Sequence, residues 1–323
     1  MTRTLSIGCG AYDRTWPLIA GLIRPEGFDF DWQVLPPEEV FLKGMLTGAF
    51  DICEMSTATY MVQRARGENL YTALPIFVSR KFRHSALYVR SDAGIERPED
   101  LRGRRIGVPE WQITAIAWVR GILSDWHGVG VADAEWLIGG IDEPGRGEKI
   151  PVEPPAGVKA RRLGAEETLW ALVEAGELDA IIAPRAPLAF HEGDSRIRRL
   201  FSDVRAAETA YYKASGQFPI MHIIGLRNDH WATDPGVATR LFDAFEAGRR
   251  HALNELHQVA YDAPMLPWAG EELAYAEALM GRDYWTYGLD ARNREGVEIL
   301  CRYAHEQGLT DRQLAVEEVF PAS

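Results

Sequence analysis

A cluster of basic side chains occupies the stretch SRKFRHSALYVR at residues 79–90. It places Arg80, Lys81, Arg83 and His84 within a few positions, in a chain with 47 acidic and 35 basic side chains. Arginine suits carboxylates because its planar guanidinium donates two parallel hydrogen bonds. The stretch therefore predicts an anion site with Arg80 and Arg83 as candidate ligands. The alternative is a solvated basic edge that deters strand pairing.

The spacing within this cluster limits which cations can serve one ligand. Side chains of an extended chain alternate between two faces, so Arg80 shares a face with His84, and Arg83 shares a face with Lys81. Both arginines can reach one ligand only if the chain turns before His84. Lys81 is expected to be solvated.

Other polar residues follow predicted strands. In EMSTATY, Ser56 and Thr57 stand where a helix begins, so their hydroxyls cap that helix or its free N–H groups hold an anion. Arg14 follows the first predicted strand and Arg185 follows DAIIAP, and either could bind an anion or lie on the surface.

Composition narrows the class of protein. The chain has 323 residues and a formal net charge of −12, which argues against a nucleic acid or an anionic membrane as partner. We find no apolar run long enough for a signal peptide or a membrane span, so the protein is expected to be cytoplasmic. The three cysteines show no zinc-binding spacing.

Short apolar runs alternate with helical patterns up to residue 226, and the remainder is almost wholly helical. This order predicts an α/β protein with two open sheets and a helical C-terminal part. We expect residues 1–90 and 222–323 to form lobe one and residues 91–221 to form lobe two. Ligands of open α/β sheets bind outside the carboxyl ends of strands, here in a cleft between the lobes.

Five motifs, in this order and spacing, are similar to one enzyme family. They are GCGAYDRTWPL, FDICEMSTATY, SRKFRHSALYVR, GVPEWQITA and FPIMHIIGL. Together they resemble 4,5-dihydroxyphthalate decarboxylase and its relatives, from about residue 5 to about residue 310. The resemblance implies a two-lobed fold like that of type II periplasmic solute-binding proteins, and a small aromatic dicarboxylate as substrate.

The implied reaction removes one carboxylate from a dihydroxylated phthalate. Direct loss of carbon dioxide would leave an aryl carbanion, so the easier route protonates the ring carbon that bears the carboxylate. A hydroxyl para to that carbon supplies electron density, and no organic cofactor is needed. The protein must hold a dianion, polarise a phenol and deliver a proton to carbon.

Histidine suits the proton donor because its pKa lies near the working pH. His84 follows the basic cluster, and His222 lies in the apolar run FPIMHIIGL, where a histidine is otherwise a core residue. Glu54 and Glu110 follow or end strands and could orient a histidine or accept the phenol proton.

Trp111 and Gln112 could stack on the ring and bond a hydroxyl, although core packing is the usual role of a tryptophan. A metal site of His84, His222 and Glu54 is an alternative that the spacing does not show. A binding protein for an aromatic carboxylate and another lyase on the same scaffold are the alternative functions. The sequence leaves a homo-oligomer open.

Overall fold

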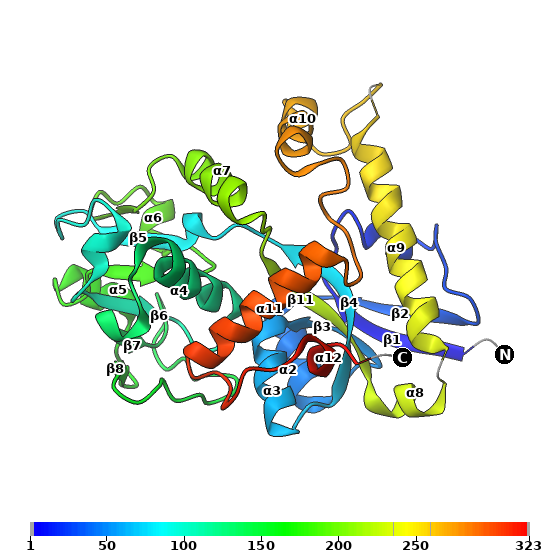
Figure 1. Ribbon diagram of the computed structural model, residues 1–323, viewed down its shortest axis with the longest axis horizontal. Helices are drawn as coiled ribbons and strands as arrows, with labels where there is room; N and C mark the ends of the chain where they lie inside the picture. The colour runs from blue at the N-terminus through cyan, green and yellow to red at the C-terminus, as the bar shows by residue number, and fades with distance from the viewer. Residues whose placement is uncertain (1–2, 235, 259, 322–323) are drawn as a thin grey trace. The chain divides into compact units, whose positions relative to one another are not determined.

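The computed structural model describes residues 3–234, 236–258 and 260–321, which form two compact units (Figure 1). The first unit runs up to Arg80, then takes Tyr212–Val297 and the chain from Ala315 onward. The second unit comprises Lys81–Tyr211 and Glu298–Leu314. Each unit contains its own mixed sheet with helices packed around it.

The sheet of the first unit has the strand order β2-β1-β3-β11-β4. The strands are β1 (Arg3–Cys9), β2 (Phe28–Val34), β3 (Ile52–Ser56), β4 (Tyr71–Arg80) and β11 (Ile220–Arg227). Strand β1 runs parallel to β2 and β3, whereas β11 runs antiparallel to β3 and β4. The carboxyl ends of β1 and β3 and the amino end of β11 therefore meet at one edge of this sheet.

Helices of the first unit follow its strands closely. They are α1 (Trp16–Ile19), α2 (Pro37–Thr47), α3 (Thr57–Arg66), α8 (Asn228–Thr233), α9 (Val237–Leu256), α10 (Ala269–Met280) and α12 (Val316–Val319). Helix α3 ends at Gly67, whose φ of 70° is a left-handed conformation that glycine adopts without strain. Close packing also needs a glycine in β1, because a Cβ on Gly8 would lie 2.5 Å from the ring of Phe50.

The sheet of the second unit has the strand order β10-β5-β9-β6-β7-β8. The strands are β5 (Leu87–Arg90), β6 (Arg105–Val108), β7 (Glu135–Ile138), β8 (Lys159–Arg162), β9 (Ala180–Ile182) and β10 (Ile197–Arg199). Strand β6 runs parallel to β7 and β9, and β5 runs antiparallel to β9 and β10. The amino end of β5 thus lies at the same edge as the carboxyl ends of β7 and β9.

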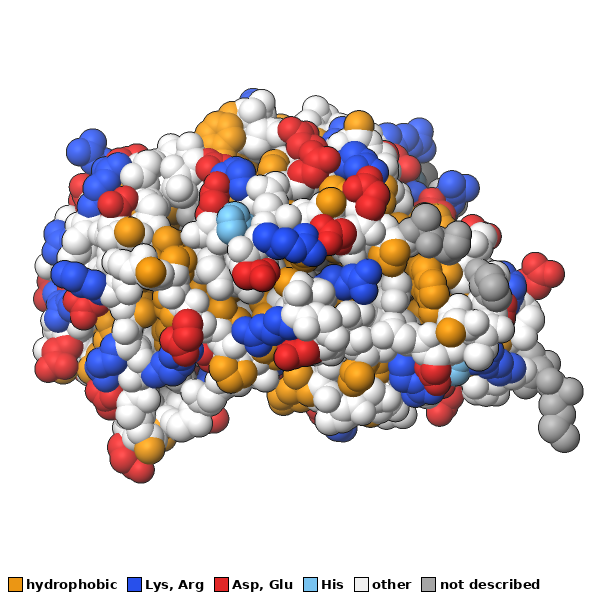
Figure 2. All heavy atoms as spheres, turned by 60° about the horizontal axis from the view of Figure 1, so that its bottom comes forward, with side chains coloured by type: hydrophobic (Ala, Val, Ile, Leu, Met, Phe, Trp, Pro, Cys, Tyr) orange, Lys and Arg blue, Asp and Glu red, His pale blue; other side chains and the backbone are white. Residues whose placement is uncertain are grey.

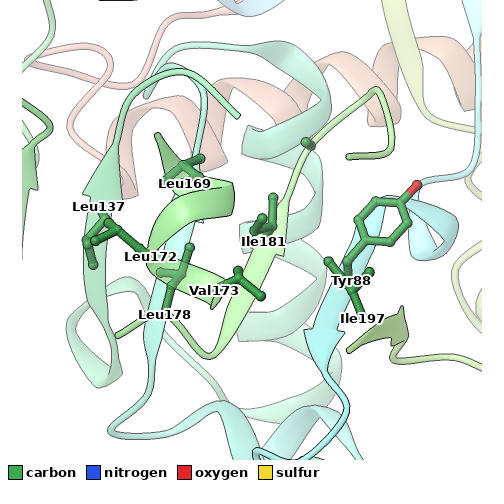
Figure 3. Packing of buried hydrophobic residues seen from close by; sticks show 9 residues of the cluster. Tyr88, Leu137, Leu169, Leu172, Val173, Leu178, Ile181 and Ile197 are labelled. Carbon is green, nitrogen blue, oxygen red and sulfur yellow. The ribbon is translucent and has the colours of Figure 1, made fainter. Parts of the chain in front are cut away.

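Apolar residues on one face of this sheet pack against a short helix. The helical elements of the unit are η1 (His84–Ala86), η2 (Pro98–Leu101), α4 (Thr114–His127), η3 (Val131–Asp133), α5 (Leu169–Glu174) and α6 (Leu188–His191). Leu169 and Leu172 of α5 pack with Leu137 of β7 and Ile181 of β9 (Figure 3). Burial of these side chains stabilises the unit by removing apolar surface from water.

The chain crosses between the units near Arg80, within α7 (Val204–Ser215), within α11 (Ala291–Glu306) and again before Ala315. The predicted boundary at 90 differs from the crossing near Arg80 because β5 pairs with β9 of the second sheet, and the predicted boundary at 222 differs from the crossing at Tyr212. Residues Glu298–Leu314, expected in lobe one, belong to the second unit.

The surface carries charges of both signs. On the face drawn in Figure 2, acidic and basic side chains are interspersed, so neither sign dominates that face. Among residues 3–234, 236–258 and 260–321, no helix has both the length and the apolar character needed to cross a membrane.

Candidate active site

Glu54, in β3, is the centre of a hydrogen-bonded group in the first unit. Its side chain has no exposed surface, and its Oε1 lies 2.6 Å from both the hydroxyl of Tyr12 and Nδ1 of His222. Its Oε2 accepts the backbone N–H of Gly10 at 2.9 Å and faces Sγ of Cys9 at 3.5 Å. A buried carboxylate is stable only when donors surround it, and this one has several.

The sheet explains why residues so distant in the chain meet. Strand β11 is antiparallel to β3 and pairs His222 with Ser56, so His222 is a diagonal neighbour of Glu54. Strand β1 is parallel to β3, so the chain after β1 passes the same edge. A Cβ on Gly10 would lie 2.9 Å from the ring of Tyr12, so the absence of a side chain at Gly10 lets Tyr12 fold back onto Glu54.

Protonation states follow from these contacts. Burial raises the pKa of Glu54, but the hydrogen bond and charge of His222 and the hydrogen bonds from Tyr12 and Gly10 outweigh it and lower that pKa. Burial, together with the negative charge of Glu54, raises the pKa of the Tyr12 phenol. At neutral pH, Glu54 is therefore a carboxylate and Tyr12 a neutral donor.

His222 is positioned to exchange a proton at its second nitrogen. Glu54 fixes the hydrogen on Nδ1, which leaves Nε2 without a hydrogen-bond partner among the described residues. The side chain is 18% exposed, and the ring of Phe41 packs edge-on against it at 5.0 Å. A carboxylate–imidazole pair with one accessible nitrogen can act as a general acid or base.

The structure brings together His222 and Glu54 of the predicted site residues, and their catalytic roles stay predictions. Tyr12 was missed, although it lies in GCGAYDRTWP, one of the polar segments that follow strands. An aromatic residue just after a glycine-rich strand end was the available signal.

Arg14 supports this group and is occupied by protein partners. Its Nε donates to the carbonyl of Val78 at 2.6 Å, and its Nη1 donates to Asp13 at 2.8 Å. The guanidinium lies 4.3 Å from the ring centres of both Tyr12 and Trp285. Arg14 therefore packs against the ring of Tyr12 and helps to fix its position.

Arg80 is a structural residue of the first unit, contrary to the expectation that it binds an anion. Its guanidinium donates to the carbonyls of Phe218 and Thr286, each at 3.0 Å, and to Oδ1 of Asn293 at 2.5 Å. Burial lowers the pKa of Arg80 to about 9. These bonds tie the end of β4 to distant segments of the same unit.

The hydroxyls at the start of α3 do not cap it. Ser56 is the residue before the helix, but its side chain makes no capping bond, and its Oγ accepts from Oγ1 of Thr59 at 2.9 Å. Thr57 donates to the carbonyl of Met221 at 2.9 Å. The capping expectation is wrong because the Thr57 hydroxyl bonds to β11 and the Ser56 hydroxyl bonds to the side chain of Thr59 and to no backbone N–H of the first turn.

His84 lies in the second unit, in an aromatic environment. Its ring centre is 5.1 Å from that of Phe201 and 5.3 Å from that of Tyr211. Burial, with the nearby charge of His127, lowers the pKa of His84 to about 4. This environment keeps the ring neutral and favours a packing role.

The alternative metal site of His84, His222 and Glu54 stays a prediction. His84 belongs to the second unit, whereas His222 and Glu54 belong to the first. In the part of the chain that the structure describes, no group of three metal-binding side chains is suitably arranged.

Glu110, Trp111 and Gln112 are buried in the second unit. Glu110 pairs with Nη2 of Arg146 at 2.6 Å and with Nζ of Lys149, and it accepts from Nε2 of Gln112 at 3.0 Å. Burial raises the pKa of Glu110, but Lys149 and Arg146 outweigh it and lower that pKa.

Trp111 is fully buried and stacks under the guanidinium of Arg120 at 3.7 Å. Its Nε1 donates to the carbonyl of Gln307 at 2.8 Å. The packing interpretation therefore holds for Trp111, because no face of its ring is open to a ligand.

Arg83 and Arg185 line a pocket of about 790 Å³ in the second unit, which we call the second-unit pocket. Arg83 is largely buried, and burial lowers its pKa to about 10. Both of these predicted anion ligands therefore lie in the wall of a cavity of the second unit.

Comparison with known proteins relates this geometry to a family. Residues 24–128 match the family model described as NMT1/THI5 like. The chain is 41% identical over 320 residues to 4,5-dihydroxyphthalate decarboxylase of Comamonas testosteroni, covering 99% of this chain and 97% of that protein. It is 43% identical over 210 residues to the Pseudomonas putida protein of the same name, covering 65% of this chain and 81% of that protein.

A solved structure shows the same fold. The periplasmic aliphatic sulphonate binding protein SsuA from Escherichia coli aligns with a TM-score of 0.54 and 10% identity, over 100% of this chain and 93% of its own. This likeness concerns the fold alone and confirms the predicted type II periplasmic-binding-protein-like architecture. On the strength of its identity to the Comamonas testosteroni protein along nearly its whole length, the chain belongs to the 4,5-dihydroxyphthalate decarboxylase family.

Proposed function

We propose that this protein is a carboxy-lyase that converts 4,5-dihydroxyphthalate to 3,4-dihydroxybenzoate and carbon dioxide. Membership of the family supports the substrate and the reaction. The structural observation that carries the proposal is the buried Glu54 carboxylate, 2.6 Å from Nδ1 of a partly exposed His222. That pair is the acid–base element that protonation of a ring carbon requires.

The reaction begins at the phenol para to the departing carboxylate. Its oxygen pushes electron density to the ring carbon that bears the carboxylate, and this carbon takes a proton. The bond from that carbon to the carboxylate then breaks, and its electron pair returns to the ring as carbon dioxide leaves. One proton is consumed and the aromatic product forms, so atoms and electrons balance.

His222 delivers the proton in this scheme. As an imidazolium it gives the hydrogen on Nε2 to carbon, and the neutral ring then regains a proton from water. Glu54 holds Nδ1–H and stabilises the positive charge, as a carboxylate does in other acid–base pairs. Tyr12 and the N–H of Gly10 hold Glu54 in place.

The electrons come from the substrate's own hydroxyl, so this scheme uses no organic cofactor and no metal. Treatment of the purified protein with a chelator tests that part of the proposal. Unchanged turnover after removal of divalent ions is expected, and turnover that returns only on adding a metal would contradict it.

Incubation with 4,5-dihydroxyphthalate tests the reaction itself. We expect carbon dioxide and 3,4-dihydroxybenzoate to form in equal amounts. Chromatography measures the 3,4-dihydroxybenzoate. The fold is shared with a sulphonate-binding protein, so the competing function is binding without chemistry. Tight binding of intact 4,5-dihydroxyphthalate with no product would favour that function.

A further inference from the structure

The second-unit pocket concentrates positive charge in an acidic chain. Its cationic lining side chains outnumber its acidic ones, Asp142 and Glu143. The cations are Lys81, Arg83, Arg185 and Arg199, together with Arg146, which pairs with the buried Glu110. Because the chain carries a net charge of −12, this excess is local and marks the pocket as an anion site.

The fold places the pocket where open α/β sheets bind ligands. Arg185 follows β9 at its carboxyl end, and Asp142 follows β7 at the same edge. Lys81 and Arg83 precede β5, whose antiparallel direction brings its amino end to that edge. The pocket thus lies outside the carboxyl ends of β7 and β9, where open α/β sheets bind their ligands.

Three of these cations act on one another. Partial burial lowers the pKa of Lys81, and the positive charges of Arg83 and Arg199 lower it further. The carboxylate of Glu208 raises the same pKa. The carboxylate of Glu208 also attracts Arg83. Three positive charges around this carboxylate leave an excess that an anion would relieve.

Apolar side chains also line the pocket and could pack against the ring of an aromatic ligand. The ring of Tyr88 is held in the hydrophobic cluster, and Figure 3 shows its hydroxyl directed away from that cluster. Tyr88, Ile141, Ala186 and Leu188 all line the pocket. A volume of about 790 Å³ is in the range of small-molecule sites.

We propose that the second-unit pocket binds the two adjacent carboxylates of an aromatic dicarboxylate through Lys81, Arg83 and Arg199. The inference rests on the proposed function for the identity of its ligand. It adds two ligands that the sequence did not indicate, since Lys81 was expected to be solvated and Arg199 was not singled out. Recognition is of the carboxylate pair, so the ring hydroxyls are not required for binding.

Calorimetric titration of the full chain with phthalate, which lacks the hydroxyls, tests this inference. We expect phthalate to bind, and Lys81→Gln and Arg199→Gln each to weaken it about tenfold, the effect of one charge-assisted hydrogen bond. Both side chains are on exposed residues, so these variants should fold. Benzoate, with one carboxylate, should bind at least tenfold more weakly than phthalate.

Arg83→Gln should weaken phthalate binding most because Arg83 is buried in the pocket wall. The control is Arg97→Gln, which alters a 74% exposed side chain of the same unit outside the pocket. Unchanged affinity in Lys81→Gln and Arg199→Gln would overturn the proposal, as would equal affinity for benzoate and phthalate.

The same variants separate this inference from the proposed function. If phthalate binding depends on Lys81 and Arg199 while 4,5-dihydroxyphthalate is never decarboxylated, the pocket stands and the proposed function fails. If carbon dioxide is released while phthalate affinity is unchanged in both variants, the proposed function stands and the pocket assignment fails.

Discussion

Replacing Glu54 by glutamine removes the charge behind His222 and keeps the size of the side chain. The single oxygen of the amide can still accept from Tyr12, whereas the N–H of Gly10 then loses its acceptor. The charge that faces Nδ1 of His222 at 2.6 Å disappears. The variant thus tests whether Glu54 stabilises the imidazolium that gives up the proton.

The size of the effect follows from the distance. A carboxylate in contact with an imidazolium puts the two charge centres about 4 Å apart, worth about 4 kcal/mol at an effective dielectric constant of about 20. The charge of Glu54 acts on His222 before the transfer, by helping it to hold the proton that the ring carbon takes. We therefore expect kcat to fall about 100-fold to about 1000-fold, which corresponds to about 3–4 kcal/mol.

The assay is the initial rate of 3,4-dihydroxybenzoate formation, with circular dichroism to confirm folding. A matched control exists in the first unit, where Oδ1 of Asp51 lies 2.6 Å from Nε2 of His230. Asp51→Asn disturbs the same chemical pair away from the site and should leave kcat unchanged. A kcat in Glu54→Gln within about threefold of wild type, or an equal loss in both variants, would refute the reasoning.

Three further outcomes are expected. Tyr12→Phe removes one hydrogen bond to Glu54 and should lower kcat about fivefold, with phthalate affinity retained; an unchanged rate would show that Tyr12 does not hold Glu54. Because burial lowers the pKa of His84 to about 4, only the unfolded chain binds that proton between about pH 6.5 and 4, so urea stability should fall by about 3 kcal/mol as the pH drops. His84→Phe should flatten this dependence, and an unaltered pH slope would contradict the assignment. Arg80→Gln should lower the urea midpoint while phthalate affinity of the folded protein stays unchanged, whereas weakened binding would restore Arg80 as a ligand.

Most of the fold followed from hydrophobic patterns. Alternating apolar runs and helical segments predicted two open sheets and a helical C-terminal part, and the structure has both. Strand β4 contains Pro75, which is untypical of a strand interior. The structure accommodates that proline because β4 lies at the edge of its sheet.

The site could be predicted in part. His222 and Glu54 were identified because a histidine and a carboxylate at strand ends are visible in the sequence. Tyr12 was not, because its contact with Glu54 depends on how the loop after β1 folds past Gly10. Spacing alone also could not separate Arg80 from Arg83, since the chain passes from one unit to the other between them.

Residues after a strand are not always available to a ligand. Glu110 follows β6 at the expected edge, yet Arg146 and Lys149 from a distant loop cover it. That loop is rich in glycine and proline, a composition typical of exposed segments. Its packing onto Glu110 arises from tertiary ion pairs that local patterns do not encode.

The central claim is that His222 delivers the proton during decarboxylation. Its most direct test compares the release of carbon dioxide from 4,5-dihydroxyphthalate by the wild-type protein and by His222→Gln. A measurement of phthalate affinity in both proteins is the control, and the two affinities should be equal. We expect the wild type to release carbon dioxide and the variant to lose at least about 100-fold in rate. Near-normal release by His222→Gln would contradict it.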